Sequence, residues 1–182
     1  MATNLETGEP EFWERSNCSD VLLGVQASAS MPFVSKIVYV EGKPCLDGGC
    51  CVHIPYRWAM EEGYEKILVI RTRHRDFRYP DPEKQETLSL QIYRNYPAFA
   101  EKLSWSHRRY NAECDELQTL EDAGRVFVIA PSVTWSAAKL ERDMEKLGRW
   151  YWQGCRDAQA AYPALREYLE NAQNEPLGDC VR

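Results

Sequence analysis

The chain has 182 residues, a formal net charge of −6 with histidine neutral, and 44% hydrophobic residues. This length is sufficient for one domain with a buried core, and the acidic balance argues against general nucleic-acid binding, which requires a basic surface. The longest apolar runs, 67–70 and 126–130, are much shorter than the roughly 18–20 residues that span a membrane.

The first third of the chain is predicted to form short strands and helices separated by turns. Residues 2–5 and 11–14 flank the turn-forming stretch 6–10 and therefore indicate a hairpin. A helix over 20–25, capped by Ser19, is predicted to follow. The next predicted elements are a strand over 37–40, a turn at 41–44 and a second strand that ends at Leu46. A helix that begins at Pro55 is predicted to end at Gly63.

Two continuous apolar runs, Lys66–Arg71 and Arg125–Pro131, are typical of strands buried on both faces. Between them, a helical region interrupted near Pro97 carries residues at three- and four-residue spacing, which indicates one buried stripe. The stripe consists of Phe99, Leu103, His107, Tyr110, Cys114 and Leu117. On such a stripe, His107 is interpreted as a core or boundary histidine rather than a base.

The end of the chain is predicted to be helical. A second apolar stripe consists of Leu140, Met144, Leu147 and Tyr151, and Pro163 is expected to open a last short helix. The polar tail from Asn171 onward is expected to fray. Strands that alternate with helices indicate an α/β fold with a largely parallel sheet flanked by helices.

The cysteines and the first residues indicate a cytoplasmic protein. The N-terminal residues have neither the basic nor the apolar segment of a secretory signal. An odd number of irregularly spaced cysteines favours reduced thiols: Cys18, Cys45, Cys50, Cys51, Cys114, Cys155 and Cys180. Of these, Cys45, Cys50 and Cys51 lie near His53, but their spacing matches no standard zinc motif. The sequence therefore predicts no metal and no cofactor, and zinc is the less favoured interpretation.

The segment Leu46-Asp47-Gly48-Gly49 is the most informative motif, because it closes a short apolar strand and precedes a proline-led helix. Adjacent glycines allow a tight turn and a close backbone approach, so Asp47 is presented at the end of a strand. An Asp-Gly pair by itself also fits a plain hairpin turn. The surrounding residues favour a functional interpretation.

Upstream of the motif stands Ala27-Ser28-Ala29-Ser30-Met31-Pro32, and downstream stands the strand-forming segment 63–73. This order of a small-residue block, a strand, Asp-Gly-Gly, a proline-led helix and a further strand resembles a bacterial branch of the patatin-like phospholipases. The resemblance extends over residues 1–75 and implies the C-terminal half of a layered, patatin-like catalytic domain. It implies that residues 76–182 are a helical C-terminal region of the same domain with one further strand, 125–131.

The resemblance implies a serine lipid acyl hydrolase that cleaves phospholipid or neutral-lipid esters with a Ser-Asp dyad. Asp47 matches the family's dyad aspartate, the base that accepts the proton of the serine hydroxyl, and Gly48 and Gly49 shape its turn. A carboxylate that acts as a base toward a hydroxyl needs apolar surroundings. We expect Leu46, Val52 and Ile54 to provide them.

The family's nucleophile motif, Gly-x-Ser-x-Gly, and its glycine-rich oxyanion loop are absent from the sequence. None of the ten serines has the required flanking glycines. In the family both elements precede the strand that begins here at Ala2. We therefore expect this chain to be a fragment that is inactive alone; the alternative is a non-enzymatic interaction module derived from the same fold.

One basic stretch follows the first apolar strand: Arg71, Arg73, Arg75 and Arg78, with His74 among them. Because ligands bind beyond strand carboxyl ends in open α/β sheets, these residues suggest peripheral contact with an anionic membrane surface. A solvated loop is the more favoured interpretation.

Overall fold

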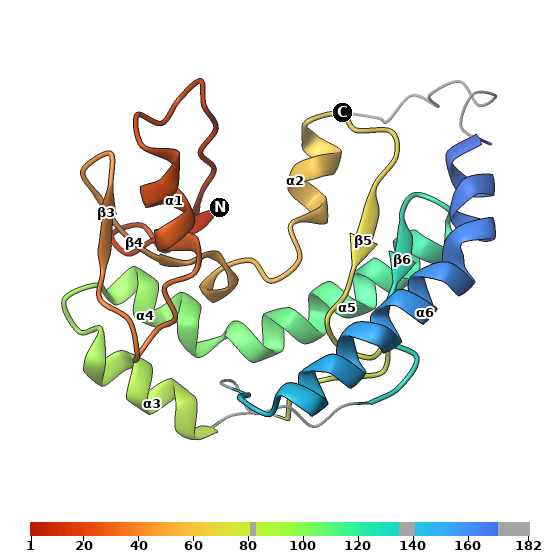
Figure 1. The fold of residues 1–182 in the computed structure, drawn as a ribbon. Helices are drawn as coiled ribbons and strands as arrows, with labels where there is room; N and C mark the ends of the chain where they lie inside the picture. Colours follow the sequence, from red (N-terminus) through yellow and green to blue (C-terminus); the bar gives the residue numbers. More distant parts are fainter. Residues whose placement is uncertain (81–82, 135–140, 171–182) are drawn as a thin grey trace. The chain divides into compact units, whose positions relative to one another are not determined.

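The computed structural model describes residues 1–80, 83–134 and 141–170 and shows a mixed α/β protein (Figure 1). The chain forms two compact units. Unit 1 comprises Met1–Pro55 and Arg78–Glu113, and unit 2 comprises Tyr56–Phe77 and Cys114–Arg182. Each unit therefore combines residues from both sides of residue 75.

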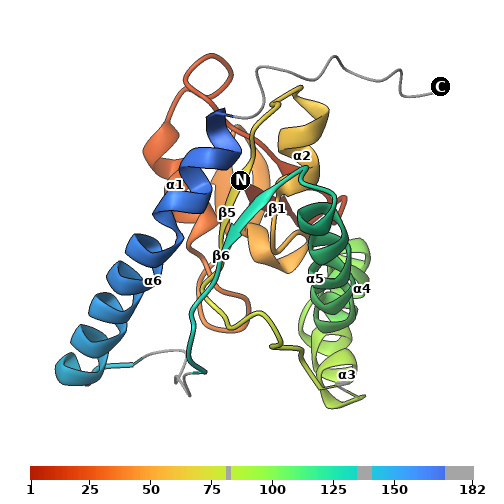
Figure 2. The ribbon, with the colours of Figure 1, turned by 90° about the vertical axis from the view of Figure 1, so that its right-hand side faces the viewer.

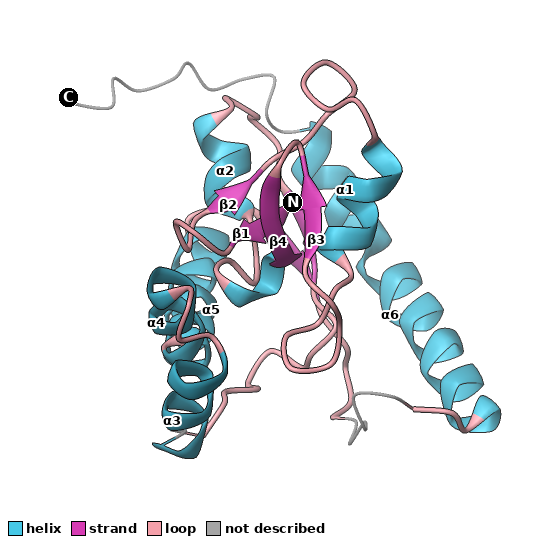
Figure 3. Ribbon diagram, turned by 90° about the vertical axis from the view of Figure 1, so that its left-hand side faces the viewer, coloured by secondary structure: helices cyan, strands magenta, loops and turns pink. Residues whose placement is uncertain are grey.

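Unit 1 contains a four-stranded antiparallel sheet with the order β2-β1-β4-β3 (Figure 3). Its strands are β1 (Ala2–Asn4), β2 (Pro10–Glu11), β3 (Val38–Val40) and β4 (Lys43–Asp47). The two predicted hairpins are confirmed, although the second strand of the first is shorter than expected. The turn between β3 and β4 has positive φ at both Glu41 (49°) and Gly42 (78°), as in the two-residue turns whose twist matches paired strands.

Unit 2 contains β5 (Leu68–Ile70) and β6 (Phe127–Ile129), which pair in parallel with Ile70 opposite Ile129. The prediction that both runs are buried on two faces is wrong. Val69 and Val128 are buried, whereas Leu68 is 41% exposed and Ile70 is 70% exposed. A parallel sheet was expected to be the larger one, but in the described residues the larger sheet is antiparallel because short hairpins connect its neighbouring strands.

The predicted helical region is confirmed as α3 (Glu83–Ile92), α4 (Pro97–Ser104) and α5 (Ser106–Asp122), with Pro97 in the first turn of α4. Its apolar stripe is buried at Phe99, Leu103, Tyr110, Cys114 and Leu117. His107 is half-buried and stacks on Tyr79 at 3.9 Å between ring centroids, as expected for a boundary histidine.

The core of unit 1 forms where α4 meets the sheet. Phe99 and Leu103 cluster with Leu5 and Leu46, and all four side chains are at most 3% exposed. Because Leu46 directly precedes Asp47, this core fixes the end of β4.

Two shorter helices are close to prediction. Helix α1 (Val21–Ser28) is capped by Asp20, whose carboxylate accepts from the Leu23 amide at 3.1 Å, rather than by Ser19. Helix α2 (Tyr56–Glu61) follows Pro55 and ends before Gly63, where φ is +81°. A positive φ is accommodated by glycine without strain and ends a helix.

Helix α6 (Met144–Glu170) differs most from prediction, because it continues through Pro163 as one helix. The predicted buried stripe is not formed by its described members, since Met144 is 77% exposed, Tyr151 is 66% exposed and Leu147 is only half-buried. Leu140 and the tail from Asn171 lie outside the described residues. Although α6 has 27 residues, no helix in the described part of the chain is both long and apolar enough to cross a bilayer.

Candidate functional site

Asp47 lies at the end of β4, as the sequence predicted, and its backbone is held on both sides. Its amide donates to Ser30 O at 2.9 Å, and its carbonyl accepts from the Thr3 hydroxyl at 2.8 Å. The strand ends there because Gly48–Cys50 turns as a short helix that Asp47 caps, with Oδ1 accepting from the Gly49 amide at 2.8 Å. The half-buried carboxylate is therefore fixed by its own turn.

The two glycines of the motif have different roles. A Cβ on Gly48 would lie 2.9 Å from the backbone oxygen of Met1 and 2.7 Å from its Cε, which is closer than packed atoms approach. A Cβ on Gly49 would meet only Asp47 Oδ1, at 3.2 Å. Gly48 thus allows the turn to pack against the start of β1, and Gly49 supplies the amide that positions the carboxylate.

Replacing Gly48 by alanine is expected to destabilise unit 1 by about 1–3 kcal/mol, because the added methyl group overlaps backbone that cannot move independently of the sheet. Chemical denaturation measures the change. The matched control is Gly49→Ala, which faces a side-chain oxygen and should be the milder substitution. Equal effects of the two substitutions would contradict this account of the turn.

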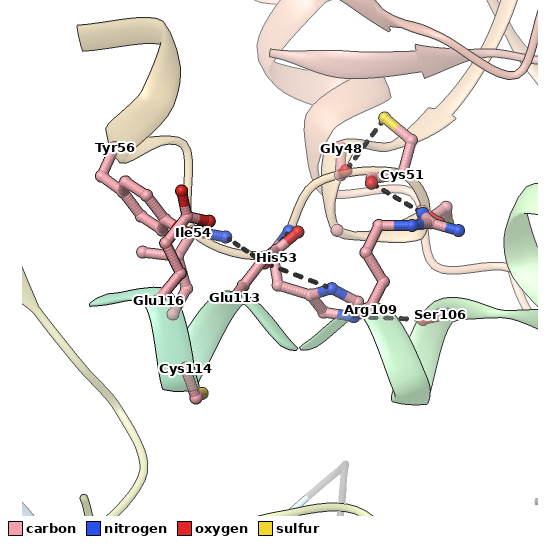
Figure 4. Close-up of polar contacts among 12 residues, drawn as sticks. Gly48, Cys51, His53, Ile54, Tyr56, Ser106, Arg109, Glu113, Cys114 and Glu116 are labelled. Carbon is pink, nitrogen blue, oxygen red and sulfur yellow. Dashed lines mark hydrogen bonds and ion pairs between the residues drawn. The ribbon is translucent and has the colours of Figure 1, made fainter. Parts of the chain in front are cut away.

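Arg109, on α5, is hydrogen-bonded to the backbone at the end of the Gly48–Cys50 turn (Figure 4). Its guanidinium donates to Cys51 O at 2.7 Å and to Cys50 O at 3.4 Å. It also donates to Lys102 O at 2.5 Å, in the last turn of α4, where helix carbonyls lack partners within the helix. Burial raises the pKa of the Cys51 thiol, so this thiol is protonated and is not a nucleophile at neutral pH.

His53 connects the same segment to two other residues of α5 in unit 1 (Figure 4). Its Nε2 lies 3.1 Å from Ser106 Oγ, and its Nδ1 lies 3.8 Å from Glu113 Oε2. Glu113 Oε2 also accepts from the amides of His53 and Ile54, both at 3.2 Å. Burial lowers the pKa of His53 to about 4, and the electrostatic influence of Arg109 and His107 acts in the same direction, so the imidazole is neutral.

The order of serine, imidazole and carboxylate in this group is that of a nucleophile, a base and an orienting acid. Two observations favour a structural role instead. Ser106 is only 6% exposed, so an ester carbonyl does not reach its hydroxyl, and the distance of 3.8 Å between His53 and Glu113 is too long for a hydrogen bond. We interpret these contacts as the attachment of the 50–55 segment to α5.

The neutral His53 is expected to make stability depend on pH. In the unfolded chain His53 takes up a proton below about pH 6.5, whereas in the folded protein it does so only near 4. Between these two pH values only the unfolded state gains the proton. The contribution of His53 to the free energy of unfolding is therefore complete above pH 6.5 and is lost as the pH falls toward 4, by about 3 kcal/mol in total. Urea denaturation at about pH 7.5 and about pH 5 measures the loss.

His53→Gln is the control for this dependence, because glutamine removes the titrating group. In that variant the stability profile should be flatter between about pH 6.5 and 5, where most carboxylates are still ionised. If the stability of His53→Gln changed with pH as steeply as that of the wild type, another group would cause the pH dependence.

The arginines of the basic stretch have different surroundings in the structure. Arg71 is 9% exposed and donates to Arg75 O and to Cys114 Sγ, at 3.2 Å each. Arg75 pairs with Glu121 and donates to Val128 O. Arg73 lies 4.4 Å over the Phe77 ring, and Arg78 belongs to unit 1. Arg71 and Arg75 are therefore engaged within unit 2.

The less favoured zinc interpretation concerned Cys45, Cys50, Cys51 and His53. Within residues 1–80, 83–134 and 141–170, no three His, Cys, Asp or Glu side chains form a group suited to a metal ion. The cysteines in these ranges are free thiols: Cys18, Cys45, Cys50, Cys51, Cys114 and Cys155.

Sequence reasoning identified Asp47 and its glycines but missed Arg109, Ser106 and Glu113. These three residues lie on α5 and contact a segment more than 50 positions earlier in the chain. The only signal was the polar spacing on the helix, which is also typical of a solvent-exposed face.

Residues 96–170 match the model of a family described as a domain of unknown function (DUF6363). The matched segment includes α4, α5, β6 and α6, is less than half of the chain, and does not include Asp47. No curated protein matches the chain.

Proposed function

We propose that this chain carries the aspartate of a Ser-Asp dyad in a patatin-like lipid acyl hydrolase, within a layered α/β fold of that family and in the cytoplasm. The observation that carries the proposal is the geometry of Asp47 at the end of β4. Its carboxylate is held by the Gly49 amide, and Gly48 allows the turn to pack closely on β1. The motif order around it, which resembles that family, supports the same function.

In this mechanism a serine hydroxyl attacks the ester carbonyl, and Asp47 accepts the hydroxyl proton. An acyl-enzyme forms, the alcohol leaves with a proton, and water releases the carboxylic acid. Asp47 Oδ1 accepts from Gly49 N, and Oδ2 has no hydrogen-bond partner within the described part of the chain. The free oxygen is the one that the serine hydroxyl would meet.

The proposal requires a nucleophile from another segment. Ser30 is the serine bonded to Asp47 through its backbone, but it is 6% exposed and its hydroxyl donates to Gln26 O at 2.8 Å. Its hydroxyl is therefore not directed to the Asp47 carboxylate. We propose that the nucleophile is supplied by a Gly-x-Ser-x-Gly segment that is not among these 182 residues.

The test compares ester hydrolysis by the protein from the complete reading frame with hydrolysis by these 182 residues, on p-nitrophenyl butyrate and on phospholipid vesicles. We expect turnover by the complete protein and none by the isolated chain. Turnover by the isolated chain would overturn the requirement for an external nucleophile. A reading frame without Gly-x-Ser-x-Gly, and without turnover, would overturn the enzyme proposal and favour a non-enzymatic interaction module.

A further inference from the structure

Unit 2 contains a cavity of about 500 Å³ at the carboxyl ends of the parallel strands β5 and β6. Ile70 and Ile129 line it from the strands, and Trp150 and Gly154 line it from α6, which runs beside the two strands (Figure 2). Ligands in open α/β sheets bind beyond the carboxyl ends of parallel strands. The volume is within the range of small-molecule sites.

The apolar part of the cavity results from incomplete coverage of the two-stranded sheet. Ile70 and Ile129 are paired in register and lie on the same face as Phe127. Near the other end of that face, the Tyr168 ring of α6 packs against Phe127 at 5.6 Å between centroids. The helix thus covers one end and leaves Ile70, which is 70% exposed, facing the cavity. An apolar ligand would bury this surface.

The ionisable groups of the lining favour an anion. Three of them carry or can take up positive charge, namely Arg71, Arg73 and His74, and one, Asp157, is acidic. Burial alone would raise the pKa of Asp157, but hydrogen bonds from Ser132 lower it. This carboxylate is therefore ionised, and it already accepts from the Ser132 amide at 3.1 Å.

The two arginines of the lining have different surroundings. Arg71 is 9% exposed and is committed to Arg75 O and Cys114 Sγ. Arg73 is half-buried and lies over the Phe77 ring. Beside it, Nδ1 of His74 accepts from the Asp76 amide at 3.2 Å and lies 3.6 Å from the Asp76 carboxylate, which leaves Nε2 of His74 as the nitrogen that can donate to a head group. Positive charge therefore meets apolar surface at the β5 side of the cavity.

We propose that this cavity binds an anionic amphiphile, with one carboxylate or phosphate head group at Arg73 and His74 and an apolar body against Ile70, Ile129 and Trp150. The inference goes beyond ester hydrolysis and does not depend on it, because every lining residue belongs to unit 2 and Asp47 belongs to unit 1.

Isothermal titration calorimetry of the 182-residue chain with three probes of equal tail length tests the head-group preference. The probes are decanoate, decyl phosphate and decyltrimethylammonium, each below its micelle concentration. We expect one molecule of decanoate or decyl phosphate to bind per chain, at least about tenfold more tightly than the cation. The anion that binds more tightly identifies the head group as carboxylate or phosphate.

Gly154→Leu tests the location. Gly154 lines the cavity, and a Cβ added there meets no atom within 4 Å, so leucine can enter the open space. The substitution also favours the helix, because glycine is a poor helix former. The matched control is Gly148→Leu, in the same helix and with the same free space but outside the cavity lining. Gly154→Leu should weaken anion binding about tenfold or more, and Gly148→Leu should leave it unchanged.

Arg73→Gln tests the head-group contact and should remove most of the preference for anions over the cation. The inference is overturned if the cation binds as tightly as both anions. It is also overturned if Gly154→Leu, shown to be folded by circular dichroism, retains wild-type affinity. If Gly154→Leu does not fold, two results remain: the preference of the wild-type protein for anions over the cation, and the loss of that preference in Arg73→Gln. The inference then stands if both are observed and is overturned if either is missing.

Discussion

Replacing Asp47 by asparagine is expected to reduce ester turnover by the complete protein about 10²–10⁴-fold, the usual contribution of a positioned general base. Asparagine retains the shape of the side chain, and its amide oxygen can still accept from the Gly49 amide, as Asp47 Oδ1 does at 2.8 Å. The turn should therefore remain folded while the proton acceptor is lost. Steady-state kinetics on p-nitrophenyl butyrate measure the effect.

Asp20→Asn is the matched control, because Asp20 also caps a helical turn, with its Oδ1 accepting from the Leu23 amide at 3.1 Å. It lies at the start of α1 rather than at the end of β4. Turnover by this variant should equal that of the wild type. If Asp47→Asn hydrolysed the ester at the wild-type rate, Asp47 would not be the general base, whichever residue is the nucleophile.

Replacing Arg109 by methionine is expected to destabilise unit 1 by about 2–4 kcal/mol, the largest stability effect that we predict. The substitution keeps an apolar stem but removes the donors to Cys50 O, Cys51 O and Lys102 O. Hydrogen bonds from charged donors contribute more than neutral ones, and in the variant three partly buried carbonyls lose a charged donor. Urea denaturation measures the loss.

Arg108→Met is the control for this substitution, since Arg108 is exposed and its guanidinium lies 4.5 Å over the Trp105 ring. Cation–π contacts at exposed sites contribute about 0.5–1 kcal/mol, so the control should be the milder change. Amide hydrogen exchange in residues 50–54 should increase in Arg109→Met and not in Arg108→Met. Unchanged exchange there would mean that Arg109 does not hold the segment after Asp47.

The parts of the candidate site that could be predicted are the parts that form locally. The turn between β3 and β4 needs only Glu41 and Gly42, and the capping of the next turn needs only Asp47 and Gly49, two positions apart. Such contacts are encoded by neighbouring residues, so a short motif is sufficient to predict them.

The contacts that hold this turn in place could not be predicted in the same way. Ser106 lies 53 positions from His53, and Arg109 lies 58 positions from Cys51. A polar residue that faces a distant backbone carbonyl has the same spacing on its helix as one that faces water. Only the folded chain decides which polar groups of α5 are partnered.

Pro163 lies inside a helix, which the local sequence does not predict. Proline removes one amide donor and is expected to end or begin a helix, yet α6 continues through it from Met144 to Glu170. Tyr168 anchors the far end, since its hydroxyl lies 3.1 Å from Arg125 O and 3.2 Å from Ile67 N. Tertiary packing of the last turns thus outweighs the local preference.

The sequence by itself determined the hairpins, the strand end at Asp47, the buried stripe of α4 and α5, and the mixed α/β character, because periodicity and turn chemistry act over a few residues. Only the tertiary structure decided how much of each apolar run is covered. Ile70 and Val69 are equally apolar, but Ile70 is 70% exposed and Val69 is 8% exposed. Burial depends on what packs against a side chain, and that partner is chosen by the fold rather than by the run itself.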